Sequence, residues 1–297
     1  MNKNLSVSIY EPIYRIDQSI SDKNFSPLIR LENSRPDWRE FQIFLEIYRN
    51  GMYRNKSQTG VFSPKFSLKC KISSTEFLNL IHDNPGYDVY FINPFPQIAY
   101  WSFNVWMQGE IAHPGLCTLA QKLFDVCKLD INLKLVPRHG PNILLYSNFW
   151  VGSEKFWTGF VGGWLLPIAE FLENNPEHTV TRAVMKETGH TSPTPFLPFI
   201  IERLFSTFLS ITSGWKYISY PIDDNKLLSY CVTDYEKILY DRMRSQILEA
   251  DFKGEFTPDL IFKMEMVSTL WQQHFNDFFA SNIHPHTGSI VPKHDAC

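Results

Sequence analysis

The stretch from Ser73 to Pro96, SSTEFLNLIHDNPGYDVYFINPFP, contains the signals for a helix, a turn and a strand in succession. Ser73 and Glu76 stand three residues apart, which is the spacing of a capping box, and predict a helix that begins here. The Asn-Pro-Gly triplet at residues 84–86 ends that helix. The apolar run that follows predicts a buried strand that breaks at Pro94. A helix that leads directly into a buried strand is typical of an α/β sheet.

The segments on the N-terminal side repeat this pattern. Residues 6–10 (SVSIY) and 59–63 (TGVFS) predict strands, and residues 35–51 (RPDWREFQIFLEIYRNG) predict a helix between them with one apolar face. The first hundred residues therefore alternate strand and helix. This order predicts a mixed α/β sheet flanked by helices. Further strands are expected at residues 131–136 (INLKLV) and 142–151 (NILLYSNFWV).

The last third of the chain has a different, helical character. Thr233 and Glu236 form a second capping box, and Thr257 with Pro258 opens a long amphipathic segment. We therefore expect a sheet domain over residues 1–230 and a helical C-terminal extension over 231–297 that ends in a flexible tail. The apolar stripe of the extension suits packing on its own core, a homo-oligomer surface or peripheral docking at a membrane.

Composition narrows the class of protein. The net charge is −3 over 297 residues, which argues against a chain built around nucleic-acid phosphates. The five cysteines include no CxxC pair, so disulfide and zinc frameworks are not expected. The N-terminus lacks the apolar core of a signal peptide, and no apolar run reaches membrane-spanning length. These features predict a cytoplasmic protein.

Polar side chains beside the ends of predicted strands are the first candidates for a site. Ser63, Lys65 and Lys69 follow the strand at 59–63, and Asn93 follows the next one. Ligands of open α/β sheets bind at the carboxyl ends of strands, where lysines and a hydroxyl suit a phosphate or diphosphate. A solvated turn explains the lysines equally well. For Asn93, an Asx turn before proline is the stronger interpretation.

Two helix-start segments carry further candidates. The stretch WMQGEIAHPG combines Trp106, Glu110 and His113, an aromatic ring with polar groups as in many carbohydrate sites. A loop that caps its own helix is the alternative. Arg39 lies in a first helical turn and suits a phosphate, although the acidic residues beside it suit the helix dipole alone.

Glu202 is the strongest single candidate. It lies with Arg203 in PFIIERLFSTFLS (residues 198–210), a predicted helix that is apolar nearly all round. A desolvated carboxylate needs a partner or a task. Glu202 is therefore a candidate general base with a raised pKa, or the partner of a buried arginine.

Five segments in this order form a resemblance: RPDWREFQIFLEIYRNG, TGVFSPKFSLK, YDVYFINPFP, SNFWVGSEKFW and FIIERLFSTFL. Together they resemble bacterial glycosyltransferases of O-antigen and capsule (lipopolysaccharide) gene clusters, which have the GT-A, Rossmann-like nucleotide-sugar transferase fold. The likeness spans residues 35–212. It implies transfer of a sugar from a nucleotide-diphosphate donor to a glycan or lipid-linked acceptor, at or near the inner membrane.

The resemblance also implies roles for residues. Ser63, Lys65 and Lys69 would lie near the donor, and Asn148 and Trp150 would line the acceptor side. The carboxylate of the helix at 198–210 would lie at the bottom of the site. A base must take the proton of the acceptor hydroxyl, and Glu110 and Glu202 are the candidates. Positive charge must stabilise the leaving diphosphate, and Lys65, Lys69 and Arg39 are the candidates.

The chain departs from the family pattern in one respect, because it contains no Asp-x-Asp triplet for Mn²⁺ or Mg²⁺. Either Asp88 or Asn93 helps to hold a metal, or lysines and arginines alone bind the diphosphate. The departure leaves a second hypothesis open, that of a non-catalytic carbohydrate-binding or scaffolding module in a glycan assembly complex.

Overall fold

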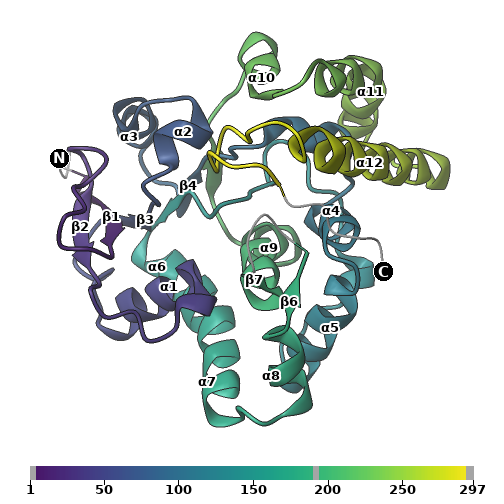
Figure 1. The fold of residues 1–297 in the computed structure, drawn as a ribbon. Coiled ribbons are helices and arrows are strands. Elements are labelled where there is room, and N and C mark those ends of the chain that lie inside the picture. The colour runs from purple at the N-terminus through teal and green to yellow at the C-terminus, as the bar shows by residue number, and fades with distance from the viewer. Residues whose placement is uncertain (1–4, 190–193, 292–297) are drawn as a thin grey trace.

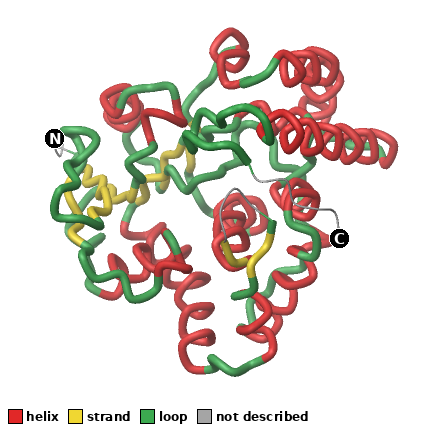
Figure 2. Tube along the Cα trace, viewed as in Figure 1, coloured by secondary structure: helices red, strands yellow, loops and turns green. Residues whose placement is uncertain are grey.

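A computed structural model describes residues 5–189 and 194–291, and its centre is a six-stranded sheet with the order β2-β1-β3-β5-β4-β8. All strands of this sheet run parallel except β5, which lies antiparallel between β3 and β4. Figure 2 shows how short these strands are beside the helices. The strands are β1 (Val7–Ile13), β2 (Ser26–Ile29), β3 (Gln58–Val61), β4 (Val89–Phe91), β5 (Trp150–Gly152) and β8 (Tyr217–Ser219).

The strands β3, β4 and β5 are buried throughout, and because side chains of successive residues point to opposite faces, both faces of the sheet are covered there. On β4, Val89 and Phe91 belong to the larger hydrophobic cluster, whereas Tyr90 belongs to a smaller one. Helices α2 (Phe66–Cys70) and α3 (Ser74–Asp83) cover the smaller cluster. The expected mixed sheet flanked by helices is confirmed.

The remaining helices pack mainly around the larger cluster, and Figure 1 shows them below the sheet, to its right and, for α10 and α11, above it. A two-stranded ribbon of β6 (Glu187–Thr188) and β7 (Thr194–Pro195) precedes α9. The helices are α1 (Glu40–Arg49), α4 (Val105–Ala112), α5 (Leu116–Val126), α6 (Glu154–Phe156), α7 (Leu166–Asn174), α8 (Thr179–Val184), α9 (Phe196–Ile211), α10 (Asp224–Tyr230), α11 (Asp234–Lys253) and α12 (Pro258–Phe279).

Local signals for helix starts are borne out. Ser73 and Glu76 form a full capping box at α3, and Thr233 and Thr257 cap α11 and α12. The strand predicted at 131–136 is wrong, because this run is an irregular segment with one 3₁₀ turn, Leu133–Leu135. The strand predicted at 142–151 is reduced to the three residues of β5.

The C-terminal extension shares the core of the sheet domain. Tyr240 of α11 packs edge-on against Tyr100 with 4.7 Å between ring centroids, and Ser268 of α12 donates a hydrogen bond to the carbonyl of Trp101. Arg138 pairs with Asp251 at 3.1 Å. The boundary expected at residue 230 therefore does not coincide with a break in the core. The last six residues of the expected tail lie outside the described part of the chain.

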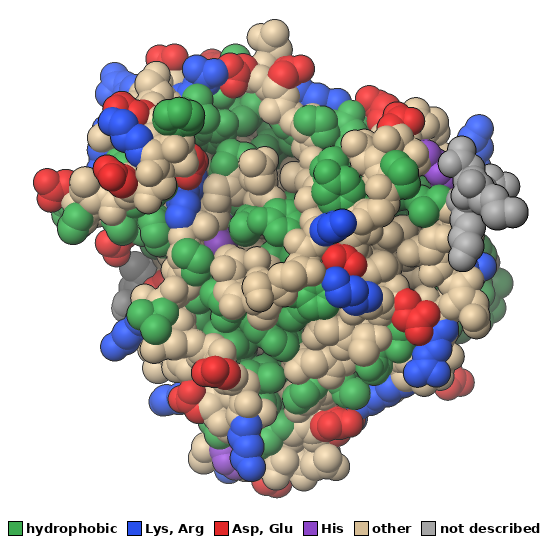
Figure 3. Space-filling model, turned by 180° about the vertical axis from the view of Figure 1, so that it is seen from behind, with side chains coloured by type: hydrophobic (Ala, Val, Ile, Leu, Met, Phe, Trp, Pro, Cys, Tyr) green, Lys and Arg blue, Asp and Glu red, His purple; other side chains and the backbone are tan. Residues whose placement is uncertain are grey.

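The apolar stripe of α12 is divided between core and surface. Leu260, Met264 and Trp271 are buried, whereas Phe262 is 63 % exposed. On the face that Figure 3 shows, acidic and basic side chains are interspersed with hydrophobic ones. Within residues 5–189 and 194–291, the helices are too short or too polar for any of them to span a membrane.

Candidate functional site

The carboxyl ends of the parallel strands bring several predicted residues to one edge of the sheet. Ser63 follows β3 and Asn93 follows β4, while Asn148 precedes the antiparallel β5. The pairing of Phe91 with Trp150 continues in a hydrogen bond from Ile92 N to the Phe149 carbonyl at 3.0 Å. This register places Asn93 beside Asn148, at the edge where open α/β sheets bind ligands.

A chain of hydrogen bonds connects a lysine to a glutamate at this edge. Lys69 Nζ of α2 donates to Ser147 Oγ at 3.0 Å, and Ser147 N donates to Glu202 Oε1 of α9 at 2.7 Å. Elements that are far apart in sequence, α2 and α9, thus meet through one serine. The structure brings together Lys69 and Glu202, and adds Ser147, which no sequence motif indicated.

The backbone of the connecting loop is held in an uncommon conformation. Ser147 has φ 62° and Asn148 has φ 54°, so two consecutive residues other than glycine lie in the left-handed region. Such residues persist where the surrounding structure holds them, and they cluster at functional sites. The bond from Ser147 N to the Glu202 carboxylate is one contact that holds this loop.

The electrostatic surroundings of Lys69 extend the cluster. Burial lowers the pKa of Lys69, while the carboxylates of Glu202 and Glu40 act in the opposite direction and Lys65 acts in the same direction as burial. Lys69 therefore lies within electrostatic reach of two carboxylates and a second lysine. Lys65 itself is exposed.

Glu202 is not sealed by its neighbour in the sequence. Arg203 is 2 % exposed and donates to the carbonyls of Val105 and Phe199 at 2.9 and 2.7 Å and to Gln108 Oε1 at 2.6 Å. The Arg203 Nη1 to Glu202 Oε2 distance is 3.7 Å, and the Glu202 side chain is 24 % exposed. Oε2 of Glu202 therefore has no close hydrogen bond from Arg203.

Arg39 lies at the carboxyl end of the neighbouring strand β1. Its Nη2 donates to Thr194 Oγ1 at 2.8 Å. Burial raises the pKa of Tyr14, which follows β1; Glu40 acts in the same direction, and Arg30 and Arg39 oppose it. Tyr14, which the sequence did not single out, therefore shares this corner with Arg39 and Glu40.

Two predicted residues have structural roles elsewhere. Glu110 caps α5, because its carboxylate accepts from Gly115 N at 2.7 Å and from Cys117 N at 2.8 Å. Asp88 lies at the amino end of β4, on the opposite edge of the sheet, where Lys155 Nζ is 3.1 Å away. The Glu110 carboxylate is therefore occupied by backbone N–H groups, and Asp88 lies at the edge opposite to the Lys69–Glu202 cluster.

The aromatic candidates for an acceptor site are in the core. Trp150 is 0 % exposed and stacks on Phe44, and Trp106 is 3 % exposed with its Nε1 bonded to Thr207. Both indoles are therefore part of the core, and neither offers an open ring face to a sugar in this structure. His113 is also buried and stacks on Phe199 at 3.8 Å.

The two asparagines are buried at the edge itself. Asn93 Oδ1 accepts from Phe95 N at 3.1 Å, which is the Asx turn that the sequence favoured. Asn148 is 7 % exposed, in the left-handed loop. Asn93 therefore shapes the edge rather than offering its amide to solvent.

The polar groups at this edge of the sheet are not those that a divalent cation needs. Mn²⁺ and Mg²⁺ prefer several oxygen ligands, usually carboxylates. Within the described parts of the chain, no group of three His, Cys, Asp or Glu side chains is arranged to hold a metal ion. Lys65 and Lys69 lie beside the carboxylates of Glu202 and Glu40, and this mixed set of charges does not fit a divalent cation.

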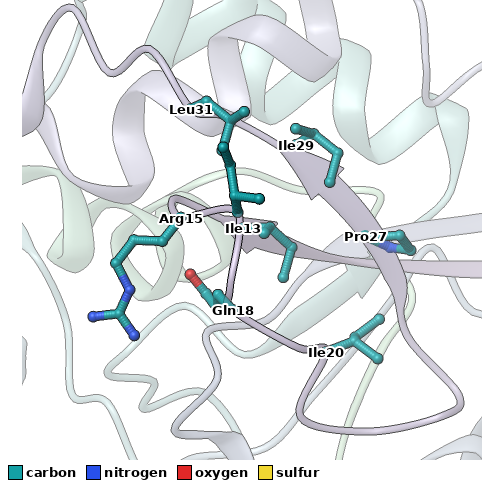
Figure 4. Close-up of a pocket in the computed structure, with 8 residues that line it drawn as sticks. Ile13, Arg15, Gln18, Ile20, Pro27, Ile29 and Leu31 are labelled. Atoms are coloured by element: carbon teal, nitrogen blue, oxygen red, sulfur yellow. The ribbon is translucent and has the colours of Figure 1, made fainter.

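A separate hollow of about 380 Å³ lies along the edge strand β2. In Figure 4 the guanidinium of Arg15 extends away from the apolar side chains of Ile13, Pro27 and Ile29. Because its lining contains no carboxylate and no lysine, we place the candidate site at the Lys69–Glu202 cluster instead. The hollow is lined by Ile13, Arg15, Ile16, Gln18, Ile20, Pro27, Ile29 and Leu31.

Comparisons of the chain with protein-family models, with curated proteins and with solved structures found no match.

Proposed function

We propose that this chain is a glycosyltransferase of the GT-A type, which moves a sugar from a nucleotide-diphosphate donor to a glycan or lipid-linked glycan in the synthesis of a surface polysaccharide. The observation that carries the proposal is the link from Lys69 through Ser147 to Glu202 at the carboxyl edge of the sheet. A cation and a carboxylate held side by side supply the two kinds of group that the reaction needs.

The topology of the sheet supports a nucleotide at this edge. The chain passes from β1 to β2 on one side and then to β3 on the other side of β1, so the strand order reverses between β1 and β3. Ligands of open α/β sheets bind in the crevice at such a reversal. Tyr14 follows β1, and Ser63 and Lys65 follow β3. These residues are our candidates for the donor side.

The chemistry requires a base and positive charge. The acceptor oxygen attacks the anomeric carbon, the bond from that carbon to the phosphate oxygen breaks, and the diphosphate leaves with the electron pair. Glu202 is our candidate to take the acceptor proton, because one of its oxygens is fixed by Ser147 N and the other is free of a close bond from Arg203. Lys65, Lys69 and Arg39 are our candidates to stabilise the leaving diphosphate.

The proposed reaction uses no Mn²⁺ or Mg²⁺, because the side chains of the Lys69–Glu202 cluster do not fit a divalent cation. Asn93 and Asn148 are assigned to the architecture of the edge, and Glu110, Trp106, Trp150 and Asp88 are left out. The expected compartment remains the cytoplasm, in which nucleotide sugars are available as donors.

A thermal-shift screen with UDP, GDP, CMP and dTDP, with and without Mn²⁺, tests the proposal. A ligand at one hundred times its Kd adds about 2.7 kcal/mol to the free energy of unfolding, which is readily measured. We expect a shift with one nucleotide class in the wild type, a loss of that shift in Lys69→Met, and no effect of Lys122→Met. Lys122 is exposed on α5, and Figure 1 shows α5 at the lower right, away from α2.

The same screen separates the second hypothesis. If every nucleotide fails to shift the melting temperature while a surface glycan binds, the chain is a carbohydrate-binding or scaffolding module. The reaction itself is measured as nucleotide released from the donor sugar in the presence of acceptor.

A further inference from the structure

The end of the described chain returns to the candidate site. Residues 282–291, the C-terminal strap, follow α12, and Figure 1 shows this yellow segment beside α2 and the sheet. His284 N donates to the Ser289 carbonyl at 2.9 Å, and Val291 N donates to the Phe279 carbonyl at 2.8 Å. The sequence predicted a solvated tail here, but His284 and His286 are 8 % and 7 % exposed. The strap is therefore a packed part of the fold.

Phe95 connects the strap to the lysine cluster. The His286 ring lies 5.5 Å from the Phe95 ring, and Lys69 Nζ lies 6.0 Å from the centre of the same ring. The Tyr146 ring is 6.2 Å away from it. His286 and Lys69 thus approach one aromatic side chain, beside the residue that precedes the Ser147 loop.

The charges that face the two histidines are mostly positive. Burial lowers the pKa of His286 to about 4, and His284, Lys69, Lys71 and Lys65 act in the same direction. Burial also lowers the pKa of His284 to about 4, with Lys69 and Lys65 in the same direction. The carboxylates in reach of Lys69 are Glu202 and Glu40. Both histidines are neutral at pH 7 and lie in a positive field.

The two histidines differ in their hydrogen bonds. His284 Nδ1 accepts from His286 N at 3.1 Å, so protonation of that atom would break the turn of the strap. His286 Nδ1 is buried and has no hydrogen-bond partner among the described residues, and the same is true of Tyr146 OH. A buried polar atom without a partner requires an explanation, and a group that binds a ligand is one such explanation. His286 can gain a proton on Nδ1 without the loss of a hydrogen bond. His284 holds His286 in place, because its Nδ1 accepts from His286 N.

We propose that His286 is an anion-binding residue of the candidate site, which takes up a proton when a diphosphate binds at Lys65 and Lys69 beneath the closed strap. The inference rests on the proposed function for the identity of the anion. A bound diphosphate would offset the field of the lysines and favour the imidazolium form, which then donates from Nδ1 to the anion.

Calorimetric titration with pyrophosphate at pH 7.0, in two buffers of different ionisation enthalpy, counts the protons taken up. We expect the wild type to take up more protons than His286→Asn, and the variant to bind roughly threefold to tenfold more weakly at pH 6.0, since one pKa unit corresponds to a factor of ten. The titration of pyrophosphate itself is the same in both proteins and cancels in the difference. His274→Asn is the matched control, because His274 lies on α12 and bonds to Thr233.

The pKa of His286 can also be measured in the wild type by NMR, which avoids any variant that fails to fold. In the wild type with ¹³C-labelled histidine, saturating pyrophosphate should raise the pKa of His286 from about 4 to roughly 6.5–7, which is the value that proton uptake at pH 7.0 requires. An unchanged His286 pKa, or equal proton uptake in the wild type and His286→Asn, overturns the inference.

Titrations with UDP and with pyrophosphate distinguish a failure of this inference from a failure of the proposed function. If UDP binds no better than pyrophosphate while His286 still takes up the proton, the nucleotide-sugar function fails and the anion site stands. If UDP binds selectively and His286→Asn changes neither affinity nor proton uptake, the proposed function stands and the role of His286 is refuted.

Discussion

Replacement of Glu202 separates its two roles, because Gln preserves one of them and Ala preserves neither. In Glu202→Ala, Ser147 N loses the acceptor that lies 2.7 Å away, next to a backbone with φ of 62° and 54° at residues 147 and 148. A hydrogen bond to a charged group contributes about 2 kcal/mol, and within the described part of the chain the Ser147 N–H has no other hydrogen-bond acceptor. Glu202→Gln keeps an oxygen for Ser147 N and should cost about 1 kcal/mol or less.

The expected readouts follow from these values. For a domain of this size, 1 kcal/mol shifts Tm by roughly 2–4 °C, so Glu202→Ala should melt roughly 4–8 °C below the wild type. Glu202→Gln should melt within about 4 °C of it. If Glu202 is the base, both variants should lose about 10²- to 10⁴-fold in the rate of nucleotide release from the donor in the presence of acceptor.

The assays are differential scanning calorimetry and turnover on the same preparations, with Glu265→Gln on the exposed face of α12 as the control. Glu202→Gln with more than a tenth of the wild-type turnover would refute the assignment of the base. An unchanged Tm in Glu202→Ala would refute the claim that this carboxylate holds the Ser147 loop.

Four further variants test the site and the fold. Lys69→Met removes a cation from the edge and should weaken UDP at least about tenfold by calorimetric titration, since a charge-assisted hydrogen bond is lost. Gly60→Ala should cost about 3 kcal/mol or more, because its Cβ would lie 2.5 Å from the Trp150 carbonyl oxygen in the middle of the sheet. Gly163→Ala meets no atom closer than 4.0 Å and should be neutral or stabilising by about 0.5 kcal/mol, so urea titration of the pair isolates the close contact. Burial lowers the pKa of His139 to about 3, with Arg138 acting in the same direction. His139→Gln should therefore flatten the pH dependence of stability below pH 6.5.

The sign of the His139 effect follows from proton binding. Its pKa is about 3 in the folded chain and near 6.5 in the unfolded chain, so between these values only the unfolded chain binds the proton. Stability is then lost as the pH falls through this window, by up to roughly 1.4 kcal/mol per pH unit, and the residue contributes no slope above pH 6.5. Urea unfolding at pH 4–7 measures the slope, with exposed His82→Gln as the control. Equal slopes in the wild type and His139→Gln would contradict this explanation.

Features that depend on neighbouring residues were predictable from the sequence. The capping box at Ser73 and Glu76 forms as predicted, and the alternation of helix and strand in the first hundred residues gives the mixed sheet. These signals are local, since a side chain caps the backbone three residues away. The apolar run at 131–136 has the composition of a strand, yet it folds as an irregular segment. Ile131 and Val136 are buried, whereas Leu135 is 75 % exposed, so the composition of this run predicted neither its secondary structure nor its burial.

The candidate site was predictable only in its parts. The sequence alone placed Ser63, Lys65 and Asn93 at the ends of strands, and it singled out Glu202 as a carboxylate in an apolar helix. It did not indicate that Lys69 and Glu202 meet through Ser147, or that His286 returns to the lysines from the far end of the chain.

For the two candidate tryptophans, the sequence supplied the residue type and the tertiary structure decided its use. Trp106 and Trp150 have the residue type of a sugar platform, but the tertiary structure uses both as core. Whether an indole faces solvent or a neighbouring ring depends on contacts between segments more than a hundred residues apart, as between Trp106 and Thr207. The sequence by itself thus determined the elements and the kinds of side chain available at their ends. Only the packing of distant elements decided which of these side chains meet, because hydrogen bonds, charge and burial act through space and not along the chain.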